Sequence, residues 1–159
     1  MNALDILKYG HQTVRQSLDG LHDSAWEKPG ACGVWSVKDI IAHLASFELM
    51  LVDVLASLTG SEEPIPHLTQ FIELGPQFND SEVDRRKAQT TRETLQEYND
   101  AHMQVMSLAA RIDPAVFARV GTLPWYGEVY SLDDFIVYTF YGHKREHSAQ
   151  IALFRDHAN

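Results

Sequence analysis

Two histidines near the C-terminal end of the sequence have a spacing that suits metal binding. His143 and His147 lie in the stretch "TFYGHKREHSAQIALF", four residues apart in a segment that is predicted to be helical. Four residues is just over one helical turn, so both imidazoles project from the same face. On a solvent-facing side they would be ordinary polar residues. On a core-facing side they need polar partners, and a metal ion is a strong candidate.

The surrounding apolar residues predict that this face points inward. Strides of three and four residues define one stripe, which comprises Ile136, Phe140, His143, His147, Ile151 and Phe154. An i, i+4 pair of histidines supplies two of the three protein ligands of an open metal site. The third ligand must then come from another helix.

His43 is the preferred third ligand, because it borders an apolar stripe inside a second predicted helix. His11 and His102 also fall on inward stripes and are the alternatives. Neutral imidazoles suit zinc, nickel, copper and iron. Cys32 is the only cysteine, so the sequence excludes a thiolate-based structural site and an intrachain disulfide. An open site rich in histidine is the remaining interpretation.

Simpler interpretations exist for each of these residues. A single inward histidine is more often a hydrogen-bonded core residue than a metal ligand. Glu146 and Gln150 flank the histidine pair and are candidates to orient an imidazole or to contact an exchangeable ligand, but Glu146 also fits a solvated helix position. Glu146 and His102 are the candidate catalytic bases. Cys32 lies in a glycine-rich loop without a sequence-adjacent activating partner, which argues against a catalytic thiol.

The hydrophobic pattern predicts an all-α protein with four long helices, at residues 4–21, 36–58, 80–112 and 131–154. Ser36 with Asp39, and Ser131 with Asp134, resemble capping boxes at two of the helix starts. Asp80 or Ser81 is the expected cap of the third helix. Residues 123–131 suggest a short irregular or hairpin-like entry to the last one.

A long connection separates the second predicted helix from the third. Residues 59–79 contain three prolines and two glycines and show no sustained period. Adjacent antiparallel helices need far fewer linking residues, so this connection predicts a crossover in a four-helix bundle, with an up-down-down-up arrangement. Phe71, Ile72 and Phe78 in the crossover are candidate contacts of a homodimer, although covering the bundle's own core is the simpler role. The three tryptophans, Trp26, Trp35 and Trp125, are expected to be packing anchors at helix entrances.

Composition limits the classes of function. The 159 residues suit one domain spanning residues 1–159, with 45% hydrophobic and 22% charged residues. The net charge of −9 argues against nucleic-acid and membrane-surface partners. No apolar run reaches transmembrane length and no secretory signal is visible, so a cytoplasmic location is expected.

The sequence resembles the DinB/YfiT-like family of metal-binding four-helix-bundle proteins. The match rests on "WSVKDIIAHL" at the start of the second helix and "GHKREHSAQI" in the last, and it extends over essentially the whole chain. In that family the first motif supplies one histidine ligand, and a His-x-x-x-His-x-x-Gln-Ile segment supplies two. The resemblance therefore implies His43, His143 and His147 as ligands, with Gln150 as the motif glutamine. His11 and His102 lie outside the pattern.

The resemblance also implies a divalent metal, often nickel or zinc, with open coordination positions. Better understood relatives include S-transferases and isomerases that use a low-molecular-weight thiol, together with hydrolytic and self-protection proteins. The leading expectation is a metal-dependent thiol S-transferase that acts on a small molecule, or a hydrolase with the same metal site. The alternatives are a non-catalytic metal-binding or small-molecule-binding protein of a stress response, or a structural interaction domain whose histidines only form hydrogen bonds.

Overall fold

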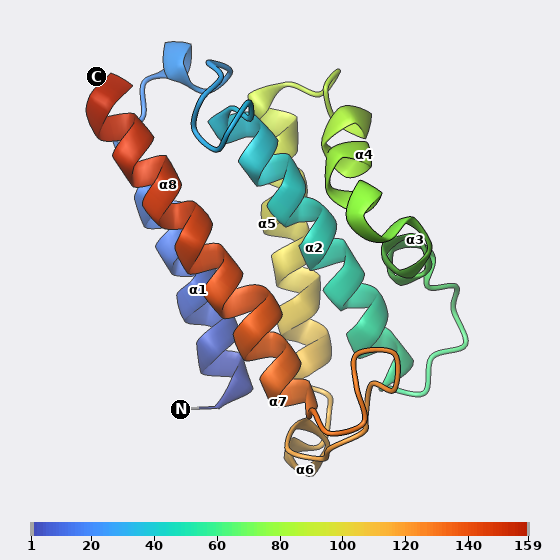
Figure 1. The fold of residues 1–159 in the computed structure, drawn as a ribbon. Helices are drawn as coiled ribbons and strands as arrows, with labels where there is room; N and C mark the ends of the chain where they lie inside the picture. Colours follow the sequence, from blue (N-terminus) through green and yellow to red (C-terminus); the bar gives the residue numbers. More distant parts are fainter. Residues whose placement is uncertain (1, 159) are drawn as a thin grey trace.

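Four long helical segments run side by side in the computed structural model, which describes residues 2–158 (Figure 1). They are α1 (Ala3–Leu18), α2 (Val37–Ser57), α5 (Thr91–Ala109) and a last segment in which α7 (Leu132–Phe135), a π-helical stretch η3 (Ile136–Gly142) and α8 (His143–Ala158) follow one another. α1 and α8 run in one direction, whereas α2 and α5 run in the other. The expected all-α bundle with an up-down-down-up arrangement is confirmed.

Short helices fill the crossover between α2 and α5. They are α3 (Pro66–Leu74), the single turn η2 (Gly75–Gln77) and α4 (Phe78–Arg85), and they lie along α2 (Figure 1). Asp53 of α2 is buried, and its Oδ2 accepts hydrogen bonds from the backbone N–H groups of His67 (2.7 Å) and Leu68 (3.0 Å). This carboxylate therefore satisfies free amide groups in the first turn of α3 and docks α3 onto α2.

The predicted continuous helix over residues 80–112 is wrong, because the chain turns between α4 and α5. Thr90 forms a capping box with Glu93, in which the Thr90 N–H donates to Glu93 Oε2 at 2.7 Å. Arg86 ends α4, and its guanidinium pairs with Glu82 at 2.8 Å and with Glu97 of α5 at 2.9 Å. Residues 80–85 thus belong to the crossover, and Thr90 replaces the expected caps Asp80 and Ser81.

The crossover residues named as candidate dimer contacts differ in their surroundings. Phe78 is 1% exposed, and Phe71 packs against both Phe78 and Phe47, with ring centroids 5.3 and 5.8 Å apart. These two rings cover the bundle's own core. Ile72 is 52% exposed and points away from it.

The central helix α2 is both long and apolar. Its mean hydropathy of 1.7 over 18 residues would suit a membrane span, yet 78% of that window is buried inside the bundle. It is the one such helix within residues 2–158. The contacts of α2 with the other helices of the bundle account for its apolar composition.

The connection from α5 to the last helix is irregular. It includes the single turn α6 (Pro114–Phe117) and contains no strand, so the hairpin-like prediction is not realised within the described chain. The Gly121 N–H donates to the Tyr130 carbonyl at 2.9 Å and closes the loop. Trp125 packs its ring against Phe135 and Phe71, with centroids 5.4 and 6.3 Å apart. It therefore anchors the loop to both the last helix and the crossover.

Both predicted capping boxes are present at their helix starts. The Ser36 hydroxyl accepts from the Asp39 N–H at 3.1 Å, and Asp39 Oδ2 accepts from the Ser36 N–H at 3.0 Å. We expect Ser36→Ala to lower the free energy of unfolding by about 1 kcal/mol, because the Asp39 N–H loses the hydroxyl that accepts its hydrogen bond. Urea denaturation measures this loss. Ser36→Gly is the control, and it should cost only a few tenths of a kcal/mol; equal stability of wild type and Ser36→Ala would contradict the assignment.

Candidate metal centre

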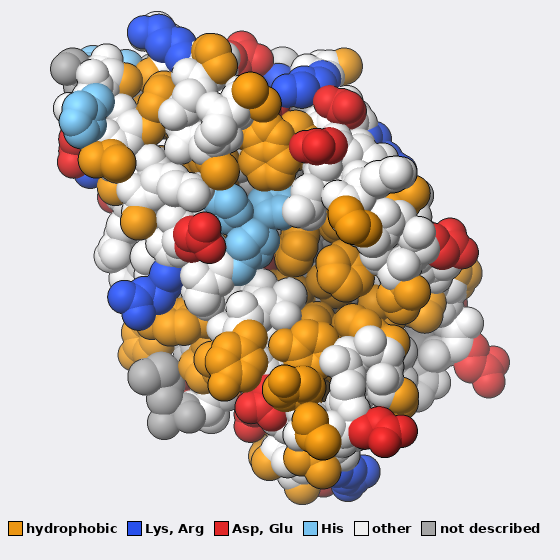
Figure 2. Space-filling model, viewed as in Figure 1, with side chains coloured by type: hydrophobic (Ala, Val, Ile, Leu, Met, Phe, Trp, Pro, Cys, Tyr) orange, Lys and Arg blue, Asp and Glu red, His pale blue; other side chains and the backbone are white. Residues whose placement is uncertain are grey.

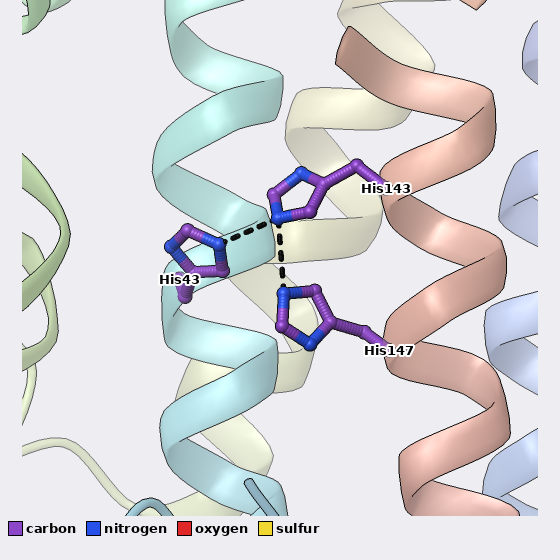
Figure 3. Close-up of side chains that lie close together, drawn as sticks. All are labelled: His43, His143 and His147. Carbon is purple, nitrogen blue, oxygen red and sulfur yellow. Dashed lines mark hydrogen bonds between the residues drawn. The ribbon is translucent and has the colours of Figure 1, made fainter. Parts of the chain in front are cut away.

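The packing of α8 beside α2 brings three histidines together (Figure 3). His143 Nε2 lies 2.8 Å from His43 Nε2 and 2.9 Å from His147 Nε2. The three ligand atoms all lie within 4.8 Å of one another. His43 lies two turns inside α2, and the other two occupy successive turns of α8. The structure thus assembles the three residues that the sequence motifs single out.

Hydrogen bonds on the outer sides of the rings set the direction of the inner nitrogens. His147 Nδ1 lies 2.8 Å from Gln150 Oε1, which can only accept, so Nδ1 carries the proton and the Nε2 lone pair faces the centre. His143 is hydrogen-bonded to the backbone of Thr139, one turn earlier. Gln150 therefore orients an imidazole, which is one of the two roles predicted for it.

Burial keeps these imidazoles neutral at physiological pH. Desolvation, together with the neighbouring His143 and His147, lowers the pKa of His43 to about 2. Desolvation and His147 lower the pKa of His143 to about 4. The pKa of His147 is also lowered, chiefly by burial. Only an unprotonated imidazole can donate its lone pair to a metal, so the surroundings favour the ligand form of all three.

The geometry fits a divalent cation. Metal–nitrogen bonds of about 2.0–2.1 Å place the ligand atoms of a tetrahedral ion roughly 3.3 Å apart. The 2.8 and 2.9 Å separations are about half an ångström shorter than that value. Three converging neutral nitrogens without a cation also leave at least two lone pairs facing each other. The three histidines could therefore hold a divalent metal ion.

The buried line of the last helix differs from the predicted stripe. Its buried positions after Phe135 are Ile136, Phe140, Lys144, His147, Ser148 and Ile151, while His143 is only partly buried at its margin and Phe154 is partly exposed. The predicted inward direction holds for His147, which is buried, whereas His143 lies at the boundary between α2 and α8 with its ring directed at His43. The physical reason is η3, whose wider π-helical turns shift the phase of the residues that follow.

This boundary position leaves His143 open to solvent. A hollow of about 380 Å³ adjoins it, lined by Phe47, Tyr138, Thr139, Gly142, His143 and Glu146. Figure 2 shows the histidine side chains grouped in the middle of one face of the molecule, with apolar side chains beside them. A small molecule can thus approach the convergent nitrogens from this side.

Two aromatic rings pack against the triad. The Trp35 and Phe47 rings lie 5.0 and 4.8 Å from that of His43, and Phe47 is also 4.7 Å from His143. Trp35 is held by a tight turn in which its N–H donates to the Cys32 carbonyl at 2.9 Å. The expected packing anchor therefore packs on the site itself. Cys32 is partly buried in this turn.

The other predicted histidines do not join the triad. His102 Nδ1 lies 3.2 Å from Glu48 Oε2, and the His11 ring stacks on His102 with centroids 3.8 Å apart. Glu48 also forms an ion pair with Lys144, and both side chains are almost completely buried. Of the two candidate catalytic bases, the exposed Glu146 lines the hollow, whereas His102 is not among the lining residues.

Sequence reasoning missed Glu48 and Lys144. A signal for Glu48 was present, because an isolated carboxylate inside a helix as apolar as α2 must find a buried partner. Nothing local indicated Lys144, which lies between His143 and the exposed Arg145. Its inward position depends on the phase shift that η3 introduces.

Comparison with known proteins agrees with this arrangement. The sequence model of the DinB superfamily matches residues 6–151, which include both histidine motifs and parts of all four long helices. Neither the curated proteins nor the solved structures contain a significant match. Because the matched region covers most of the chain, the protein belongs to the DinB superfamily.

Proposed function

We propose that the protein is a metal-dependent enzyme that acts on a small molecule, most closely of the thiol S-transferase type. The observation that carries this proposal is the convergence of three neutral imidazole nitrogens beside an open hollow. A site used only for structure would have its coordination positions closed by the protein. Here one side of the triad faces solvent, which leaves room for an exchangeable ligand.

Nickel and zinc are the proposed ions, since both accept three imidazole ligands. A divalent ion held by His43, His143 and His147 would lower the pKa of a thiol or a water molecule that binds next to it, which is the chemistry needed for S-transfer or hydrolysis. Gln150 keeps the His147 lone pair directed at this position. The Trp35 and Phe47 rings pack against His43 and place apolar surface beside this position.

The lining of the hollow indicates what the chain recognises there. Phe47 and Tyr138 offer apolar surface, and no lysine or arginine is among the lining residues. The part of a substrate that lies in the hollow is therefore apolar and carries no negative charge. Glu146 is the carboxylate on this wall, and we assign it the role of accepting a proton from a molecule bound beside His143.

Metal content of the protein purified without a histidine tag tests the proposal. We expect about one divalent ion per chain in the wild type and almost none in His43→Ala, His143→Ala or His147→Ala, because two imidazoles bind such ions far more weakly than three. Elemental analysis measures the ion, and circular dichroism verifies the fold. His22→Ala is the matched control, since His22 is an exposed histidine remote from the triad in sequence.

The outcomes separate the candidate functions. A wild type that holds no ion, even after dialysis against nickel or zinc, would remove the basis of the proposal. If the ion is present, consumption of an apolar electrophile that requires an added low-molecular-weight thiol indicates S-transfer. Consumption without thiol indicates hydrolysis. Metal binding with neither activity favours the non-catalytic alternative.

A further inference from the structure

A buried ion pair connects the two helices that carry the histidine triad. Glu48 lies on α2, five residues after His43, and Lys144 directly follows His143 on α8. Lys144 Nζ and Glu48 Oε1 are in contact, and the two side chains are 2% and 0% exposed. The pair is therefore inaccessible to solvent and one peptide unit away from a proposed ligand.

The other two long helices hold this pair in place. His102 of α5 approaches Glu48 Oε2 at 3.2 Å, and His11 of α1 stacks on His102 with an angle of 1° between the ring planes. α1 also makes room for the lysine, because a Cβ atom on Gly10 would lie only 3.2 Å from Lys144 Cδ. Both helices that carry no member of the triad thus contribute residues that fix the position of the pair.

The ion pair is not expected to stabilise the fold more than apolar side chains at the same positions would. Transfer of two charges from water to a protein interior costs about as much as their attraction returns, and apolar side chains of similar size usually do as well or better. An ion pair differs from an apolar contact in requiring a defined distance and direction between its groups. It therefore restricts how α8 can rotate or slide against α2.

We propose that Glu48 and Lys144 are positioning residues, which fix α8 against α2 so that His143 and His147 meet His43 in the geometry that binds a metal ion. This inference rests on the proposed function, in that it takes the triad to be a metal site. His143 and Lys144 are neighbours on one rigid helix, so a rotation of α8 that separates Lys144 from Glu48 also moves His143 Nε2. Ligand atoms need to be held to within about 0.5 Å for productive binding.

A neutral pair of similar size tests the inference. In Glu48→Gln/Lys144→Met the amide oxygen can still accept from His102 and the lysine stem is replaced by an apolar chain, so the bundle is expected to fold. We expect zinc affinity, measured by competition with a chromogenic chelator, to fall about 10–100-fold, the range typical of residues that orient ligands. In the metal-free protein, the ring ¹H–¹⁵N signals of His43 and His143 should shift or broaden.

Two control variants distinguish positioning from general destabilisation. Glu82→Gln/Arg86→Met removes another buried ion pair, at the end of α4, together with the contact of Arg86 with Glu97 of α5, and should leave zinc affinity and the ring signals unchanged. Gly10→Ala adds a methyl group against the Lys144 stem while improving the helix propensity of α1. It is expected to weaken zinc binding several-fold without lowering the melting temperature.

Each result supports or overturns the inference. Wild-type affinity and unchanged ring signals in Glu48→Gln/Lys144→Met would overturn it, and so would equal losses in the Glu82/Arg86 control. Failure of wild type to bind zinc or nickel would instead refute the proposed function. The ring signals of the metal-free proteins would still decide whether the pair positions the histidines.

Discussion

Glu48→Leu is expected to lower the free energy of unfolding by about 3–5 kcal/mol, because the substitution leaves the ammonium group of Lys144 buried without its counter-charge. The Lys144 side chain is 2% exposed, and Glu48 is its only ion-pair partner among residues 2–158. Burial by itself would raise the pKa of Glu48, yet Lys144 and the hydrogen bond from His102 hold that pKa at about 2. Urea denaturation of the metal-free protein at pH 7 measures the loss.

Substitution of Lys144, the other member of the ion pair, tests this explanation. Lys144→Met should cost less than Glu48→Leu, because Glu48 keeps the contact of its Oε2 with His102. The neutral variant Glu48→Gln/Lys144→Met should be more stable than Glu48→Leu, since neither charge remains buried. If Glu48→Leu unfolds at the same urea concentration as wild type, Lys144 must reach solvent and the buried pair is not maintained.

The second large effect expected is a loss of stability of the metal-free protein as the pH falls from about 6.5 to 4. Burial lowers the pKa of His11 to about 3, of His43 to about 2 and of His143 to about 4. In the unfolded chain these groups titrate near 6.5, so below that pH the unfolded state binds protons that the folded state does not. Their contribution to stability is complete above pH 6.5 and declines below it.

The expected size of the effect follows from the number of histidines. Each one changes the free energy of unfolding by up to about 1.4 kcal/mol per pH unit within this window. Partial solvent screening of the less buried rings reduces the sum for three to about 2–4 kcal/mol per pH unit. Below about pH 4 the folded state also begins to bind a proton at His143, and the decline becomes less steep.

Urea denaturation at pH 7, 6 and 5 in the presence of a chelator measures this dependence. His11→Phe should flatten the slope by roughly a third, because one proton fewer is taken up on unfolding and the aromatic stack on His102 is retained. His22→Ala serves as the control, because His22 is an exposed histidine outside the buried histidine clusters. A stability that is constant between pH 7 and 5 would show that the buried histidines take up protons in the folded protein.

Much of the fold could be predicted from short stretches of sequence. The hydrophobic pattern predicted helices over the regions of α1 and α5, and Leu7 and Val14 of α1 and Tyr98 and Val105 of α5 lie in the core. Both Ser-x-x-Asp boxes start helices, because a cap depends only on residues three positions apart. The length and irregularity of residues 59–79 were enough to predict parallel α2 and α5.

The break between α4 and α5 could not be predicted from the local sequence pattern alone. Residues 80–112 have a composition suited to one continuous helix. The Thr90–Glu93 capping box lies inside a charged stretch of sequence and does not stand out from it. The break is stabilised from outside, since Arg86 pairs with Glu97 and Lys87 Nζ lies 2.8 Å from Asp39 Oδ1 at the start of α2. Contacts between distant segments therefore stabilise the turn relative to a continuous helix.

Some features of the candidate site were likewise determined by the sequence, and others only by the tertiary structure. The identity and spacing of His43, His143 and His147 determined which side chains could meet, because residue type and helical period are properties of the sequence. Only the tertiary structure decided that His143 borders an open hollow and that Lys144 turns inward to Glu48. The rotation of a helix after a π-helical segment, and the partner that a buried charge finds on another helix, depend on how all four helices pack.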